Sequence, residues 1–307
     1  MTRGGLSNTP APLARQARLG ACGTAVLALV ALAALCVALS GCTAATKPGP
    51  PAEDTPVTVI ATAAAAPSAA LAEPPATQHS LSMRGFNLVF DDEFNGSVLN
   101  RRLWEPSLPW GNTNRAEQQY YTPQALSLRD GALVITARRQ QRKGKPFTSG
   151  VITSDQHFKF AYGFAEIRAR VPAGAGLWSA FWLVVRQRGS NEEADIVEVL
   201  GRNPTQGYAV LHYGTMIKKE INVGSYTADD LSVGWHTFAL DWQPGSMIWY
   251  VDGVERQRVT QGVPSSPMVI IANLAVGSPQ SWTGPTDPTT PFPADYKIDY
   301  IRVFQRK

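Results

Sequence analysis

Short segments in which apolar residues recur at every second position constrain this fold more than any other feature of the sequence. Eight of them are clear, at residues 131–140, 162–171, 177–185, 194–200, 234–243, 246–259, 267–276 and 297–305. Gly, Pro, Asn or Asp separates the segments, and Asp252-Gly253 is a strong two-residue hairpin signal. No segment has the pattern of a long, capped amphipathic helix. The sequence therefore predicts an all-β domain in which two antiparallel sheets form a sandwich of the jelly-roll kind.

The N-terminus has the composition of an export signal. Residues 19–40 form an uncharged, mostly apolar run that follows Arg15 and Arg18. Residues 39–42, at the end of this run, spell LSGC and resemble the bacterial lipobox, in which the signal is cut before the cysteine and that cysteine carries lipid. We therefore predict a lipoprotein signal at residues 1–41 and lipidation of Cys42, which would anchor the protein in a membrane. An uncleaved anchor is the alternative, since the run is long enough to span a bilayer. Either outcome would export the rest of the chain, and we expect a cell envelope lipoprotein that faces the extracytoplasmic side.

A composition change separates this signal from the folded part. Residues 42–82 are dominated by Ala, Pro and Thr and contain no aromatic residue, so we predict a disordered tether. All eight tryptophans lie at or after Trp104. The folded domain is expected at residues 83–307, a length suited to a single unit, and we expect it to be a monomer.

Charge and metal-ligand content exclude several classes of function. Apart from the three arginines of the first forty residues, 25 basic residues stand against 24 acidic ones, so nucleic acid is not an expected partner. Every cysteine lies before residue 43, which excludes disulfides and Cys-ligated metals from the domain. The four histidines show no close pair, so we expect no zinc or iron centre.

An acidic segment, NEEADIVEVLG at residues 191–201, interrupts this apolar pattern. In a regular strand Glu193 and Asp195 would face one side and Glu198 the other. A single β-bulge near Ile196 or Val197 would turn all three carboxylates to the same side and leave Ala194 and Ile196 facing the core. The odd spacing of the acids thus predicts a bulge.

With this bulge, the outer two glutamates could act as a catalytic pair. We expect their carboxyl groups to lie roughly 5 Å apart, which is the spacing of retaining glycosidases and less than inverting ones need. Mutual repulsion should also raise the pKa of at least one carboxyl, as a general acid requires. Spacing alone leaves two alternatives open: a solvated acidic edge strand and a cation site.

The acidic segment and its surroundings resemble one enzyme family. EADIVE is similar to the ExDxxE signature of glycoside hydrolase family 16, the laminarinase and β-glucanase family. DDEFNG, EQQYYT, DGALVITA, YGFAEIRARVPAGAGLWSAFWLV, LHYG, GWHTFALDWQPGSMIWYVDGV and PFPADYKIDYIRVFQ resemble further segments in the family's order. The resemblance covers about 220 residues. It implies a concanavalin A-like β-jelly roll with a concave substrate cleft.

The resemblance also implies roles for individual residues. Glu193 would be the nucleophile, Glu198 the acid/base and Asp195 the carboxylate that tunes their protonation. The implied or suggested substrate-binding residues are Trp178, Trp182, His212, Trp110, Asn112 and Trp282. Many members hold a structural calcium on the convex side, and the matching positions here are Glu93, Gly131 and Asp299. No cofactor is implied for catalysis.

Three positions depart from the family's pattern. Ala194 replaces a bulky aliphatic residue and Ser179 replaces a proline. Val151 stands where many laminarinases have an arginine that helps to hold the substrate, which weakens a strict β-1,3-glucan assignment.

We therefore expect an exported, retaining endo-β-glycosidase that hydrolyses β-1,3 or mixed β-1,3-1,4 glucans by double displacement. The same mechanism on a galactan or another exopolysaccharide, or a transglycosylase, is the enzymatic alternative. The non-enzymatic alternative is a glucan-binding, lectin-like module, against which the acidic pair argues.

Overall fold

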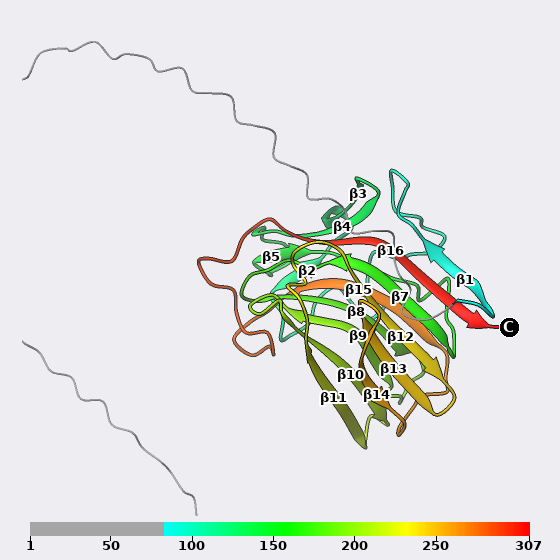
Figure 1. Ribbon diagram of the computed structural model, residues 1–307. Helices are drawn as coiled ribbons and strands as arrows, with labels where there is room; N and C mark the ends of the chain where they lie inside the picture. The colour runs from blue at the N-terminus through cyan, green and yellow to red at the C-terminus, as the bar shows by residue number, and fades with distance from the viewer. Residues whose placement is uncertain (1–82) are drawn as a thin grey trace, which may run out of the picture. The chain divides into compact units, whose positions relative to one another are not determined.

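The computed structural model describes residues 83–307, and they form a sandwich of two antiparallel sheets (Figure 1). The predicted lipoprotein signal, the lipidated Cys42 and the tether lie outside the described residues. Among residues 83–307, no helix is long and apolar enough to cross a membrane. The all-β, two-sheet architecture expected from the alternating segments is confirmed.

Eight strands form the first sheet. Their spatial order is β14-β13-β12-β7-β16-β4-β3, and β1 pairs with β16. The bounds are β1 Phe86–Asp92, β3 Leu126–Arg129, β4 Ala132–Ala137, β7 Gly163–Arg170, β12 His236–Gln243, β13 Ser246–Val251, β14 Val254–Val259 and β16 Ala294–Arg306. Asp252 and Gly253 connect β13 to β14 and both have positive φ, as a tight two-residue hairpin turn requires.

Six strands form the second sheet, in the order β11-β10-β9-β8-β15-β6. Their bounds are β6 Val151–Thr153, β8 Leu177–Val185, β9 Glu193–Leu200, β10 Gln206–Gly214, β11 Lys219–Thr227 and β15 Met268–Val276. The remaining elements are a short parallel pair, β2 Gln119–Tyr121 with β5 Phe147–Ser149, and a 3-10 turn, η1 Pro123–Ala125.

The core lies between the two sheets, where alternate residues of each strand meet. Trp242, Trp249 and Phe238 of the first sheet and Phe181 and Leu274 of the second are fully buried in one apolar cluster. Burial of such large side chains contributes about 1.5–3 kcal/mol each, which makes this layer the main source of stability. The opposite face of the second sheet carries the polar and aromatic residues described next.

Candidate active site

A β-bulge in the central strand β9 places the acidic residues of the domain. Across the ladder with β10, Asp195 pairs with Val210 and Glu198 pairs with Tyr208. Two residues of β9 but only one of β10 lie between these pairs, so β9 holds an extra residue. The ladder with β8 shifts at the same place. The bulge predicted from the spacing of the acids is confirmed.

The bulge sorts the side chains of β9 between the core and the opposite face. Ala194, Ile196 and Val197 belong to the buried apolar cluster. Glu193, Asp195 and Glu198 line a cavity of about 380 Å³ on the other side of the sheet. Three carboxylates therefore share one surface, and none of them points into the core.

The carbonyl group of Asp195, at the bulge, is held from the opposite sheet. Trp249 of β13 donates its indole N–H to this oxygen over 2.8 Å, and the bond is buried. A buried carbonyl needs such a partner, because an unpaired one would cost about 1–3 kcal/mol. The bulge is therefore fixed by the core as well as by its own ladder.

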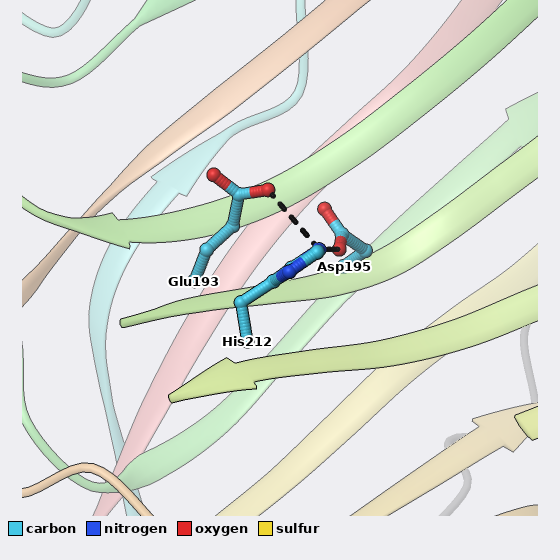
Figure 2. A group of neighbouring side chains, drawn as sticks. All are labelled: Glu193, Asp195 and His212. Carbon is cyan, nitrogen blue, oxygen red and sulfur yellow. Dashed lines mark ion pairs between the residues drawn. The ribbon is translucent and has the colours of Figure 1, made fainter. Parts of the chain in front are cut away.

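His212 joins the carboxylates from the neighbouring strand β10, where it pairs with Glu193. Its Nε2 atom lies 3.7 Å from Glu193 Oε1 and 3.5 Å from Asp195 Oδ2. Figure 2 shows the ring reaching toward both carboxylates. His212 was predicted to bind substrate, and the structure places it in ion-pair contact with Glu193 and Asp195.

Ligand atoms of Glu193, Asp195 and His212 all lie within 4.8 Å of one another, so this group could hold a metal ion. Within the described part of the chain, it is the group of this kind that the fold assembles. Carboxylate oxygen with imidazole nitrogen suits several divalent metals. The same carboxylate and imidazole atoms can also bind protons. A metal ion at this site would therefore compete with a proton for these atoms.

Burial raises the pKa of all three carboxyl groups. For Asp195 and Glu198 the pKa lies well above the usual range, because burial disfavours the charged form and neighbouring carboxylates add repulsion. Burial also raises the pKa of Glu193, although the charge of His212 opposes it. The sequence-based expectation of at least one raised pKa agrees with this arrangement. The site is thus suited to hold a proton near neutral pH.

Trp178 contacts Glu198 directly. Its indole N–H donates to Glu198 Oε1 over 3.1 Å, a bond that favours the ionised carboxylate and opposes the effect of burial. The ring of Trp178 meets Trp282 edge-on at 5.8 Å, and Trp282 packs against Tyr208 at 4.5 Å. Both tryptophans therefore lie at the Glu198 side of the cavity.

Trp182 and Trp110 line the cavity closer to Asp195 and Glu193. Their rings lie 6.1 Å apart, and the indole N–H of Trp182 donates to Asn273 Oδ1 over 2.9 Å. Asn112 does not line the cavity. Its backbone carbonyl accepts the N–H of Tyr121, and its buried Oδ1 has no hydrogen-bond partner among the described residues. The structure thus places Trp110, Trp178 and Trp182 around the acids. Trp282 packs against Trp178 without lining the cavity, and Asn112 lies in the supporting loop.

Two polar residues of the cavity were not singled out from the sequence. Glu117 is a fourth carboxylate there, whose pKa is raised by burial and whose side chain accepts from Asn114 and Gln119. Asn273 is the polar interruption of the apolar strand β15, and its amide donates to Tyr121. That interruption was the available signal for Asn273. Glu117 is the first residue of EQQYYT, one of the segments that resemble the family, and that resemblance was its available signal.

The predicted calcium ligands lie on the other sheet and its edges. Both carboxylate oxygens of Glu93 bind Arg302 at 2.7 Å, and Asp299 Oδ2 binds Arg168 at 2.7 Å. Gly131 follows β3 with positive φ. The Glu93 carboxylate is thus engaged in a bidentate ion pair, and a Ca²⁺ ion bound to it would lie against the positive charge of Arg302. Side-chain ligation by Glu93 therefore does not fit, which leaves backbone carbonyls and Asp299 Oδ1 as donors.

Comparison with known proteins places this geometry in context. The sequence profile described as Glycosyl hydrolases family 16 matches residues 113–302, which contain all three acids. A "Beta-glucanase" of Rhodothermus marinus is 31% identical over 251 residues, which are 72% of this chain and 85% of that protein. The "Endo-1,3-1,4-beta-glycanase EglC" of Rhizobium meliloti is 29% identical and is matched over 75% of this chain and 54% of its own length.

A solved structure gives the same result for the fold. The endo-beta-1,3-glucanase of Pyrococcus furiosus superposes with a TM-score of 0.64 at 32% identity, over 72% of this chain and 95% of that one. The predicted jelly-roll class is thereby confirmed.

Proposed function

This chain belongs to family 16 of the glycosyl hydrolases, and on that premise we propose that it is a retaining endo-β-glucanase acting on β-1,3 or mixed β-1,3-1,4 linkages. One observation carries the proposal: a bulge in β9 turns Glu193, Asp195 and Glu198 toward a single cavity. Retaining glycosidases use two carboxyl groups about 5–5.5 Å apart, one as nucleophile and one as acid/base. Four residues separate Glu193 from Glu198, and two of them form the bulge, which suits that separation.

In the first half of the proposed reaction, Glu193 attacks the anomeric carbon while Glu198 gives its proton to the departing glycosidic oxygen. The C–O bond to the leaving sugar breaks as a glycosyl ester with Glu193 forms. The raised pKa of Glu198 supports its role, because an acid must still hold its proton near neutral pH. In the second half, Glu198 takes a proton from water, the water oxygen attacks the anomeric carbon, and Glu193 is released as a carboxylate.

Asp195 and His212 are proposed to set the charge of Glu193. Glu193 must be ionised to attack, yet burial raises its pKa and favours its protonated form. Asp195 has a pKa well above its usual range and can retain a proton in place of its neighbours. His212 faces both carboxylates and favours their charged forms when it is protonated.

A neutral polysaccharide is the proposed substrate. Trp110, Trp178 and Trp182 line the cavity and Trp282 packs against Trp178. Aromatic faces bind the apolar faces of sugar rings. The relatives' names favour β-1,3 and β-1,3-1,4 glucans. Val151 is fully buried beside Tyr121 and Ile271, in a cluster against which Trp182 packs, so this position presents no arginine charge to the substrate. That difference favours a mixed or relaxed linkage preference over strict β-1,3 cleavage.

Export and anchoring form a second part of the proposal. The apolar run and LSGC support a lipoprotein with lipid on Cys42, attached by residues 42–82 and acting outside the cytoplasm.

A structural calcium is proposed only through backbone carbonyls and Asp299, since Glu93 is bound to Arg302. If it binds, added Ca²⁺ should raise the thermal unfolding midpoint and chelator should lower it.

Isosteric variants test the mechanism. Glu193→Gln and Glu198→Gln should each lose nearly all release of reducing ends from laminarin and lichenan while keeping the fold. Glu255→Gln is a matched control, because Glu255 is exposed on β14, in the other sheet. Proton NMR of the first products should show retention of the β-anomer. Near-parental activity of both variants, or initial inversion, would refute the assignment.

The same measurements separate the alternatives. Galactans and bacterial exopolysaccharides belong in the substrate panel, and products longer than the starting oligosaccharide would identify a transglycosylase. A protein that binds laminarin without cleaving any polymer in the panel would be the lectin-like module.

A further inference from the structure

Glu193 and Asp195 are neighbouring carboxylates whose ion-pair contacts, within residues 83–307, are all with the imidazole of His212. No lysine or arginine in that part of the chain forms an ion pair with either of them. Glu93 and Asp299, in contrast, each pair with an arginine. One imidazole carries at most one positive charge, so the pair of carboxylates has negative charge left for a further cation to neutralise.

The three side chains have the spacing of metal ligands. His212 Nε2 lies 3.7 Å from Glu193 Oε1 and 3.5 Å from Asp195 Oδ2, and all three atoms lie within 4.8 Å of one another. Bonds from zinc to nitrogen or oxygen are about 2.0–2.2 Å long, so two ligand atoms of a tetrahedral zinc ion lie ~3.3–3.5 Å apart. Two sides of the triangle are therefore in or close to this range. Figure 2 shows both carboxylates directed at the same ring nitrogen.

The oxygen of Asp195 that faces His212 gives a second and separate indication of a ligand. The residue is 4% exposed, and its Oδ2 atom accepts no hydrogen bond from any described residue. Buried polar atoms are nearly always hydrogen-bonded, and an ion is one of the partners that explains an exception. The atom without a donor is thus the same atom that the spacing identifies as a ligand.

An ion from the solvent could reach this group. Glu193 and His212 line a hollow of about 740 Å³ beside the carboxylate cavity. Their side chains are 35% (Glu193) and 33% (His212) exposed, so both could adjust to an ion and leave one coordination position to water. Three protein ligands with an open fourth position are a common arrangement for zinc.

We propose that Glu193, Asp195 and His212 form a reversible binding site for a divalent transition metal such as Zn²⁺, and that the bound ion switches the enzyme off. Imidazole together with carboxylate suits zinc and copper, whereas Mg²⁺ prefers oxygen ligands alone. A metal-bound Glu193 carboxylate is not free to attack the anomeric carbon. The binding stands on the geometry alone, and the loss of turnover rests on the proposed function.

Zinc titration calorimetry of the full chain tests the site without any turnover. His212→Gln and Asp195→Asn should each lower the zinc affinity at least tenfold, because even loss of a group that only supports a ligand costs about 10–100-fold. His157→Gln is the matched control, since His157 Nε2 lies 3.2 Å from Glu105 Oε1 but has a single carboxylate; it should bind zinc like the parent. The difference between proteins is what counts, because the N-terminal cysteines could also take zinc.

Mg²⁺ should not displace the bound zinc. Unchanged zinc affinity in both His212→Gln and Asp195→Asn would overturn the site, and so would an equal fall in His157→Gln. Asp195→Asn keeps the test decisive if thermal unfolding shows that His212→Gln does not fold.

Inhibition is measured separately, as the release of reducing ends from laminarin. Zinc should inhibit the parent half-maximally near the Kd found by calorimetry, and EDTA should restore the rate. Zinc binding without loss of turnover would overturn the switch. If the parent cleaves nothing, the proposed enzyme fails, while the calorimetric comparison still decides whether the metal site exists.

Discussion

Replacement of Asp195 by asparagine should make the domain more stable while it removes activity. Asp195 is 4% exposed, its Oδ2 atom accepts no hydrogen bond, and Glu193 adds repulsion to the effect of burial. Asparagine has nearly the same shape but no charge to desolvate. The substitution therefore removes the unfavourable burial of a carboxylate next to Glu193, although the proposed reaction needs that carboxylate.

The direction of the effect follows from the raised pKa of Asp195. A carboxyl whose pKa is higher in the folded state than in the unfolded state contributes stability that is fully present below the unfolded value, about 3.9. That contribution is lost as the pH rises through the folded value, at about 1.4 kcal/mol for each pKa unit. Loss of the contact with His212 offsets part of the gain. We expect a net gain of about 1–2 kcal/mol at pH 7, which raises the unfolding midpoint of a domain of this size by ~2–8 °C.

Thermal unfolding followed by circular dichroism between pH 4 and pH 8 measures this effect. The midpoint difference between Asp195→Asn and the parent should be small at pH 4 and grow with pH. Asp229→Asn, at an exposed position, is the control and should change little at any pH. A variant less stable than the parent at pH 7, or a difference that does not depend on pH, would refute the reasoning.

Three further results are expected. Trp178→Phe removes the hydrogen bond that favours ionised Glu198, so the pKa of Glu198 should rise. The basic limb of the kcat/KM pH profile should then move to higher pH. An unchanged limb would mean that Trp178 only stacks on sugar. Burial alone would lower the pKa of His236, but the hydrogen bond to Asp252 and the charge of Asp252 raise the pKa overall. The pair therefore stabilises the fold fully below the unfolded pKa of ~6.5. This contribution is lost as the pH rises through the folded pKa. His236→Gln should therefore lower the midpoint by ~1–3 °C at pH 5.5 and by less at pH 8, and an equal loss at both would contradict the assignment. Cys42→Ala should transfer the protein from the membrane fraction to the soluble fraction, and unchanged partition would favour the uncleaved anchor.

Local patterns were sufficient to predict the sandwich and the bulge. The period of two marks a half-buried strand wherever it occurs, and the interval from Glu193 to Glu198 is odd, so only an extra residue can bring both to one face. These inferences needed no knowledge of which strands are neighbours. The hairpin turn at Asp252-Gly253 could be predicted in the same way, since the turn type depends only on its two central residues.

Contacts between distant segments were beyond such patterns. His212 lies nineteen residues from Glu193 and approaches it only because β10 pairs with β9 in one register. The histidine spacing argued against a metal site, yet this pairing creates a group with the geometry to hold one. The pairing of Glu93 with Arg302 is of the same kind, because the arginine lies at the far end of the chain. A sequence read in isolation does not specify these partners.

The proposed reacting residues lie on a strand, whereas residues proposed to bind the polymer lie on connections between strands, and this difference matters for redesign. Both proposed reacting groups belong to β9, which has a neighbour on either side and a tryptophan from the opposite sheet at its bulge. Trp110 and Trp282, which would bind the polymer, lie on connections between strands. The connections that carry these two tryptophans are therefore natural places for loop grafting. An engineer could exchange them to change which polysaccharide is accepted, and the scissile bond would still meet the same pair of glutamates.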